Sequence, residues 1–156
     1  MRRQRQQRQL AGTNNVGSVP AGPAGAADKI AAITRGLKAV IDRCRQKVPK
    51  ATIVVTAIFP RNDNMAVVPE IAAINANLAA LADGRSIRFL NVNDKLADGD
   101  GRLFEGMTGD RLHPTLKGYQ VWADGLTPIL TELLGPRAPT DLAPPPTGDP
   151  NARPRP

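Results

Sequence analysis

One cysteine and one histidine occur among the 156 residues, and these two scarcities limit the chemistry open to the chain. A disulfide needs two cysteines, so none can form within the chain, and Cys44 is expected to pack on a helix face. A single histidine, His113, excludes a zinc site built from several histidines. Asp94, Asp98 and Asp100 share one loop but do not match the spacing of a calcium loop, so no metal or other cofactor is predicted.

Long hydrophobic runs are also absent. The longest apolar run, residues 51–59, has nine residues including two threonines, which is far too short to span a bilayer. The charged start is not followed by an apolar stretch, so no signal peptide is predicted at this start, and the compartment is left open.

Positive charge is concentrated at the two ends of the chain. Of the net charge of +7, residues 1–9 contribute +4 and residues 136–156 contribute +1, which leaves +2 for the 126 residues between them. A nearly neutral folded part gives no electrostatic reason to bind nucleic acid. The arginines of the first segment could contact phosphates only through charge, so no nucleic-acid partner is predicted.

Composition divides the chain into three parts. Residues 1–9 form an arginine- and glutamine-rich arm that is expected to be disordered. Residues 136–156 contain eight prolines and are expected to form a disordered tail. Residues 10–135 have the length of one domain.

Hydrophobic periodicity predicts alternating helices and strands within residues 10–135. Apolar residues recur every three or four positions from Ile30 to Cys44, including Val40, and again from Leu116 through Tyr119 to Leu133. A continuous β-branched run that ends at a proline is typical of a strand covered on both faces. This alternation predicts an α/β domain with a parallel sheet, in which function gathers at the carboxyl ends of the strands. The predicted elements are helix 26–47, strand 52–59, helix 69–84, strand 87–92, a loop over 94–109 and helix 115–134.

The histidine has a carboxylate three residues before it, in the segment DRLHP. Pro114 favours an extended His113 and suits the first position of a helix, so the pair is predicted at the mouth of the last helix. A carboxylate at Asp110 could fix the tautomer of His113 and stabilise its imidazolium. The spacing equally allows Asp110 or His113 to cap the following helix.

A second polar segment, GTNN at residues 12–15, lies near the other end of the domain. The side-chain amide of Asn14 could donate to a developing oxyanion, a contribution of roughly 2.7–4 kcal/mol to a reaction barrier. Gly12 would let the backbone turn tightly beside it. The alternative for this segment is a simple turn without a catalytic role.

In this order, GTNN, IFPR at residues 58–61 and DRLHPTLKGYQVWADGLTPIL at residues 110–130 resemble the later blocks of the SGNH (GDSL-type) hydrolases. The likeness is greatest to the platelet-activating-factor-acetylhydrolase-like esterases. The resemblance implies a three-layer, flavodoxin-like α/β fold and metal-free hydrolysis of acetyl or short acyl esters of lipids or carbohydrates. It makes His113 the general base, Asp110 its orienting carboxylate and Asn14 an oxyanion donor supported by Gly12.

The nucleophile implied by this resemblance has no counterpart in the sequence. In the family it is a serine in a Gly-Asp-Ser block well upstream of the Asn block, and only 11 residues precede Gly12. Ser18 lies in a loop and Ser86 before a strand, so neither is predicted to be the nucleophile. We therefore expect the C-terminal portion of such a hydrolase, with N-terminal strands and helices missing and with no activity alone. A noncatalytic binding module on the same fold is the alternative.

A missing third strand has a physical consequence for strand 52–59. Its open edge would be apolar and β-branched, which favours pairing with another chain. We expect self-association through this edge.

Overall fold

The computed structural model describes residues 12–18 and 25–137. The predicted arm 1–9 and nearly all of the predicted tail 136–156 lie outside the described residues. None of the described helices combines the length and the apolar character needed to cross a membrane. The described elements are α1 (Thr13–Ser18), α2 (Ala26–Lys47), β1 (Ile53–Thr56), η1 (Met65–Val67), α3 (Val68–Ala79), β2 (Ile87–Leu90), α4 (Asn93–Leu96) and α5 (Leu116–Leu134).

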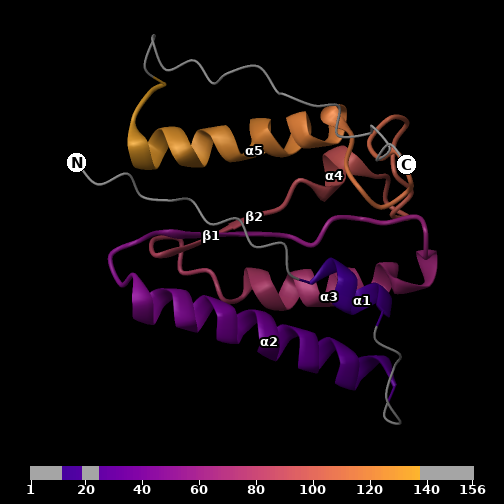
Figure 1. Cartoon of the computed structure of the whole chain (residues 1–156), viewed down its shortest axis with the longest axis horizontal. Coiled ribbons are helices and arrows are strands. Elements are labelled where there is room, and N and C mark those ends of the chain that lie inside the picture. Colours follow the sequence, from indigo (N-terminus) through magenta and orange to yellow (C-terminus); the bar gives the residue numbers. More distant parts are fainter. Residues whose placement is uncertain (1–11, 19–24, 138–156) are drawn as a thin grey trace, which may run out of the picture.

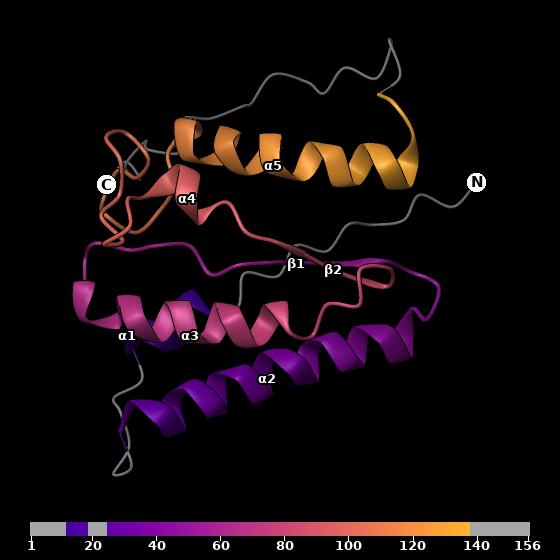
Figure 2. The ribbon, with the colours of Figure 1, turned by 180° about the vertical axis from the view of Figure 1, so that it is seen from behind.

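The described elements form three layers, with a pair of parallel strands as the middle layer. β1 and β2 run in register from Ile53 opposite Ile87 to Thr56 opposite Leu90. Helices α1, α2 and α3 lie on one side of the strands and α5 lies on the other, as both views show (Figure 1; Figure 2). The predicted α/β architecture with a parallel sheet is therefore confirmed. Among the described residues, β1 has one partner strand, β2.

Apolar side chains fill the space between the layers in two clusters. The first, around the fully buried Ile74, joins α1, α2 and α3 to one face of the sheet. The second, around Val92, joins β2 and α4 to α5 on the other face. Trp122 of α5 packs edge-on against Phe59 with ring centroids 6.0 Å apart, and its Nε1 donates to Thr56 Oγ1 at 3.3 Å. This indole therefore fastens α5 to the end of β1.

The predicted helix 26–47 coincides with α2, but two predicted apolar faces are less buried than expected. Val40 is exposed on α2, and Leu116, Tyr119 and Leu133 are exposed on α5. The cause for α5 is length, because a helix of 19 residues extends about 28 Å whereas strands of four residues extend about 13 Å. The two ends of α5 therefore project beyond the surface that they were predicted to cover.

β1 ends at Thr56, three residues before its predicted end, because helix side chains replace a strand as hydrogen-bond partner. Asn75 Oδ1 of α3 accepts from Ile58 N at 2.7 Å, and Asn75 Nδ2 donates to Ile58 O at 2.9 Å. Asn93 Nδ2 donates to the same carbonyl oxygen at 2.9 Å. These bonds satisfy buried backbone groups outside the sheet and lead the chain into the loop that follows β1.

Two short helices occur where loops or turns were predicted. Residues 13–15 form the start of α1, directly after Gly12, rather than a simple turn, because this helix buries Val16 completely. The carbonyl oxygen of Gly12 accepts the first helical bond, from Val16 N at 3.0 Å. α4 interrupts the predicted loop 94–109, and its Leu96 is buried against α5.

Candidate active site

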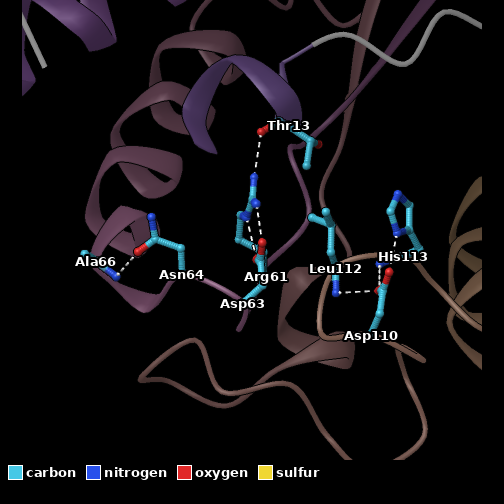
Figure 3. A network of polar contacts seen from close by, with 8 residues as sticks. All are labelled: Thr13, Arg61, Asp63, Asn64, Ala66, Asp110, Leu112 and His113. Atoms are coloured by element: carbon cyan, nitrogen blue, oxygen red, sulfur yellow. Dashed lines mark hydrogen bonds and ion pairs between the residues drawn. The ribbon is translucent and has the colours of Figure 1, made fainter. Parts of the chain in front are cut away.

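Asp110 and His113 are in contact on the loop that leads into α5 (Figure 3). His113 Nδ1 lies 2.6 Å from Asp110 Oδ2. Asp110 Oδ1 accepts from the backbone N–H groups of Leu112 at 3.0 Å and His113 at 2.7 Å. These hydrogen bonds, led by the one from the His113 side chain, hold the pKa of Asp110 well below its usual range. The predicted pair is thus assembled within a single turn of the backbone.

This contact has a direct chemical meaning. A carboxylate that remains ionised at Nδ1 favours the tautomer with a proton on that nitrogen, which leaves Nε2 free to accept a proton. The same negative charge stabilises the imidazolium that forms next. The side chain of His113 is 75% exposed, so a bound molecule can reach the ring.

The helix that follows is capped by a different residue. Thr115 Oγ1 accepts from Gly118 N at 3.3 Å, so the interpretation of Asp110 or His113 as the cap of α5 is wrong. Thr115 N also donates to Met107 O at 3.0 Å. A Cβ on Gly118 would stand 2.4 Å from that same carbonyl oxygen. A glycine at this position therefore lets the loop and the start of α5 approach closely.

Gly12 and Asn14 lie at the beginning of α1. Gly12 has φ of 114°, in the region that favours glycine, and a Cβ there would stand 2.9 Å from Ile58 Cδ1. Asn14 is exposed in the first turn, and its side chain makes no hydrogen bond to another described residue. Its amide is therefore available to a ligand as far as the described part of the chain is concerned.

Arg61 and Asn62, which lie between the predicted strand 52–59 and the predicted helix 69–84, connect the two predicted segments. Arg61 Nη1 donates to Thr13 O at 2.9 Å, and Asn62 N donates to Arg111 O at 2.8 Å. The first bond holds α1, and the second holds the loop of the Asp–His pair. Figure 3 shows Arg61 bonded to Thr13 at one end and to Asp63 at the other, with the Asp110–His113 contact to one side. Two consecutive residues thus fix the GTNN segment relative to the histidine.

The guanidinium of Arg61 is buried, with the residue only 7% exposed. A charge in such a place has to be paired, and Asp63 supplies the partner: Arg61 Nε donates to Asp63 Oδ1 at 2.7 Å and Nη2 donates to Oδ2. The hydrogen bond from Arg61 lowers the pKa of Asp63, and the same bond raises the pKa of Arg61. In the sequence, Arg61 directly follows a predicted strand and a proline, which marks the end of the strand but does not reveal the contact with Thr13, 48 residues away.

The remaining candidate groups lie elsewhere. The Ser86 hydroxyl donates to Asp83 Oδ2 at 2.5 Å and accepts from Arg45 Nη1 at 2.7 Å, just before β2 begins. The loop that carries Asp110 and His113, here called the Asp–His loop, is bonded through Arg111 O to Asn62, beyond the carboxyl end of β1. Ser86, just before the start of β2, therefore lies at the opposite end of the strands. The side chain of Ser18 lies outside the described part. Within the described part, no group of three or more His, Cys, Asp or Glu residues is arranged to hold a metal ion.

Comparison with known proteins identifies the family and the fold. The sequence model of the GDSL-like lipase/acylhydrolase family matches residues 9–121. A platelet activating factor structure from Streptococcus pneumonia is 28% identical over 78% of this chain and 57% of its own, with a TM-score of 0.62. No curated protein matches the chain.

Two further solved structures share the fold. An acylhydrolase from Bacteroides fragilis is 20% identical over 73% of this chain and 60% of its own, with a TM-score of 0.57. A GDSL-like lipase from Bacteroides thetaiotaomicron is 19% identical over 74% of this chain and 61% of its own, with a TM-score of 0.58. The chain thus spans 57–61% of the length of the three structures.

Proposed function

Because the chain belongs to the GDSL-like lipase/acylhydrolase family, we propose that it carries part of the active site of an ester hydrolase. His113 is the general base, Asp110 orients and stabilises it, and Asn14, in the first turn of α1 after Gly12, is an oxyanion donor. The observation that carries this proposal is the 2.6 Å contact between His113 Nδ1 and Asp110 Oδ2. Support also comes from the bonds of Arg61 and Asn62, which tie this pair to α1.

In the proposed reaction a serine oxygen attacks the carbonyl carbon of the ester while its proton passes to His113 Nε2. Asp110 stabilises the imidazolium, and the amide of Asn14 donates to the negatively charged carbonyl oxygen. His113 then returns the proton to the leaving alcohol as the carbon–oxygen bond breaks. Water, deprotonated by the same histidine, hydrolyses the acyl-serine and frees the acid.

We place the serine nucleophile outside residues 1–156, so the chain alone is expected to be inactive. The hydroxyl of Ser86 is already bonded to Asp83 and Arg45. Cys44 is half-buried on α2, in the layer of helices opposite α5 (Figure 1). Neither group is placed to give a proton to His113.

The proposed substrate is an ester with an acetyl or short acyl group on a lipid or a carbohydrate. The exposed ring of His113 suits a substrate that is reached from solvent, and the names of the two Bacteroides neighbours, an acylhydrolase and a lipase, describe such chemistry. No metal takes part in this scheme.

The absence of a serine near His113 within the described part also favours a second candidate, a noncatalytic binding module. In that case Asn14, Asp110 and His113 would hydrogen-bond a ligand without cleaving it. Adding a nucleophilic serine would distinguish the two candidates, because only the ester hydrolase would then cleave an ester.

The deciding experiment adds the serine block that the chain lacks. An N-terminal segment that carries the Gly-Asp-Ser block of an SGNH hydrolase is fused before Leu10, and hydrolysis of p-nitrophenyl acetate is measured. We expect activity in the fusion and none in the chain alone. His113→Ala should lower kcat at least about a hundredfold, and Asn14→Ala about a hundred- to a thousandfold.

The controls distinguish loss of the general base from loss of the folded structure. Asp28→Asn, an exposed change on α2, should leave the fusion active, and each variant is checked for an unchanged thermal transition. A soluble, folded fusion that never hydrolyses the ester would favour the binding module. Activity of the unfused chain that disappears in Ser18→Ala would contradict our placement of the nucleophile.

A further inference from the structure

A hollow opens beside the Asp–His loop, and we call it the arginine hollow. It has a volume of about 500 Å³. Its polar lining includes Arg102 and Arg111, and its apolar lining is formed by Met65, Leu103 and Phe104. Met65 and Phe104 are both exposed, which leaves apolar surface open to a ligand at this place.

Arg111 has a backbone conformation that an arginine rarely adopts. Its φ of 68° makes it the sole non-glycine residue with positive φ in the described part of the chain. The hydrogen bond from Asn62 N to Arg111 O holds this conformation. Backbone strain at a polar side chain is characteristic of functional sites, whereas glycine would occupy the same position without strain.

The positive charges of the hollow are available to a ligand. Arg111 is exposed, and its guanidinium makes no ion pair or hydrogen bond with another described residue. Arg102 pairs with Asp100 at 2.9 Å, but the two side chains are 69% and 76% exposed. An ion pair in that setting contributes little, so a ligand can replace Asp100.

The arginine hollow adjoins the candidate base. Arg111 lies between Asp110 and His113 in the chain, and two trans peptide steps separate Cα atoms by at most about 7 Å. The side chains of Arg111 and His113 therefore start from neighbouring positions of the backbone, so one elongated ligand can contact both.

Resting on the proposed function, we propose that the substrate is an amphiphilic ester that carries an anionic group, and that the arginine hollow binds it. Arg111 and Arg102 bind a phosphate or carboxylate, whose oxygens match the two-pronged guanidinium. Met65, Leu103 and Phe104 contact the apolar part of the same molecule.

The test is a binding titration on the full chain, followed by the backbone amide signals of Phe104 and Leu112 in ¹⁵N–¹H spectra. Hexyl phosphate, hexanoate and hexanol are the three probes. We expect both anionic probes to bind and to shift these signals, with affinity falling as salt is added, and hexanol to bind at least about tenfold more weakly. Tighter binding of hexyl phosphate or of hexanoate identifies the anion as phosphate or carboxylate.

Two substitutions at Arg111 separate charge from folding. Arg111→Gln removes the charge and should weaken hexyl phosphate at least about tenfold. Arg111→Gly should weaken it equally while raising the urea midpoint of unfolding, because glycine relieves the positive φ. Weaker binding in a more stable protein cannot be a folding defect. Arg35→Gln, which removes one exposed charge from α2, is the matched control and should change neither property.

Equal binding of hexanol and hexyl phosphate, or unchanged binding in Arg111→Gln, would overturn the proposal. The outcome is distinct from that of the proposed function, because binding is measured without hydrolysis. A hollow that binds hexyl phosphate in a fusion that never cleaves esters contradicts the proposed function alone. Hydrolysis without binding of either anionic probe contradicts this inference alone.

Discussion

Gly17 lies so close to the guanidinium of Arg61 that a Cβ at this position would stand 2.2 Å from Arg61 Nη1. Glycine in a helix is unfavourable by about 1 kcal/mol relative to alanine, so its presence in α1 calls for a physical reason. The reason is the close approach that lets Arg61 reach Thr13 O while remaining paired with Asp63. Gly17 thus belongs to the connection between α1 and the Asp–His loop.

Gly17→Ala is expected to destabilise the protein by about 1–3 kcal/mol, the cost of overpacking a buried contact. Arg61 cannot yield freely, because its movement would break bonds to Thr13 and Asp63. Urea unfolding, followed by the fluorescence of the single tryptophan, Trp122, gives the change in free energy. Gly36→Ala is the matched control, since nothing lies within 4 Å of a Cβ there. It should stabilise α2 by about 0.5–1 kcal/mol. Equal effects of the two substitutions would show that Gly17 has no special contact.

Asp110→Ala should change the tautomer of His113. In the wild-type protein the carboxylate at Nδ1 favours a proton on that nitrogen, and Nε2 is bare when the ring is neutral. The substitution removes this preference. Long-range ¹⁵N–¹H spectra of the imidazole at alkaline pH distinguish the two forms. A proton on Nε2 of the wild-type ring would contradict the role given to Asp110.

Asp83 should make the protein sensitive to acid. Hydrogen bonds from Ile87 N at 2.8 Å, from the Ser86 hydroxyl and from Arg85 N keep its pKa well below that of an unfolded chain. As the pH falls below about 4, the unfolded chain binds a proton that the folded protein does not, so stability decreases with falling pH. Above about pH 5 the carboxylate is ionised in both the folded and the unfolded chain, so Asp83 adds no pH dependence to the stability there. In Asp83→Asn, the urea midpoint should depend less steeply on pH between about 5 and 2 than in the wild type. Asp28→Asn is the control, and an unchanged slope in Asp83→Asn would refute the prediction.

The edge of β1 that faces away from β2 should support self-association. Ile53 N and Ala57 N donate to Ser86 O and Leu90 O, so the alternating pattern points Val54 N and Thr56 N away from β2. The average mass in sedimentation should rise with concentration. The amides of Val54 and Thr56 should then exchange more slowly, while the Ile53 amide, bonded within the chain, should not change. A monomer at every concentration, with a sharp thermal transition, would contradict this expectation.

Hydrophobic periodicity predicted those elements whose packing is determined by a single apolar face. The helix 26–47 matches α2 because its apolar positions recur at the helical period over about four turns, from Ile30 to Cys44. β1 ends early because Asn75, a residue on a helix, takes over the hydrogen bonds of Ile58. No local pattern reveals such a partner, since it is 17 residues away.

In the candidate site, too, local contacts could be predicted from the sequence and long-range contacts could not. Asp110 and His113 are three residues apart, and the contact between them is local, so the sequence indicates it directly. Arg61 acts through Thr13, at a distance of 48 residues, and through the absence of a side chain at Gly17. The sequence presents these as an ordinary arginine and an ordinary glycine. Only the tertiary structure shows that they touch.

The separation of Thr13 from Arg61 also sets an order of events during synthesis. A helix of six residues is too short to be stable in water without partners, so α1 has to wait for the groups that hold it. Arg61 leaves the ribosome 48 residues after Thr13, which at about 5–20 residues per second is a delay of about 2–10 s. During this interval the GTNN segment has no fixed place, and Val16, later the most buried residue of α1, faces water. The first residues of this site to be made therefore remain unpositioned until Arg61 has been made.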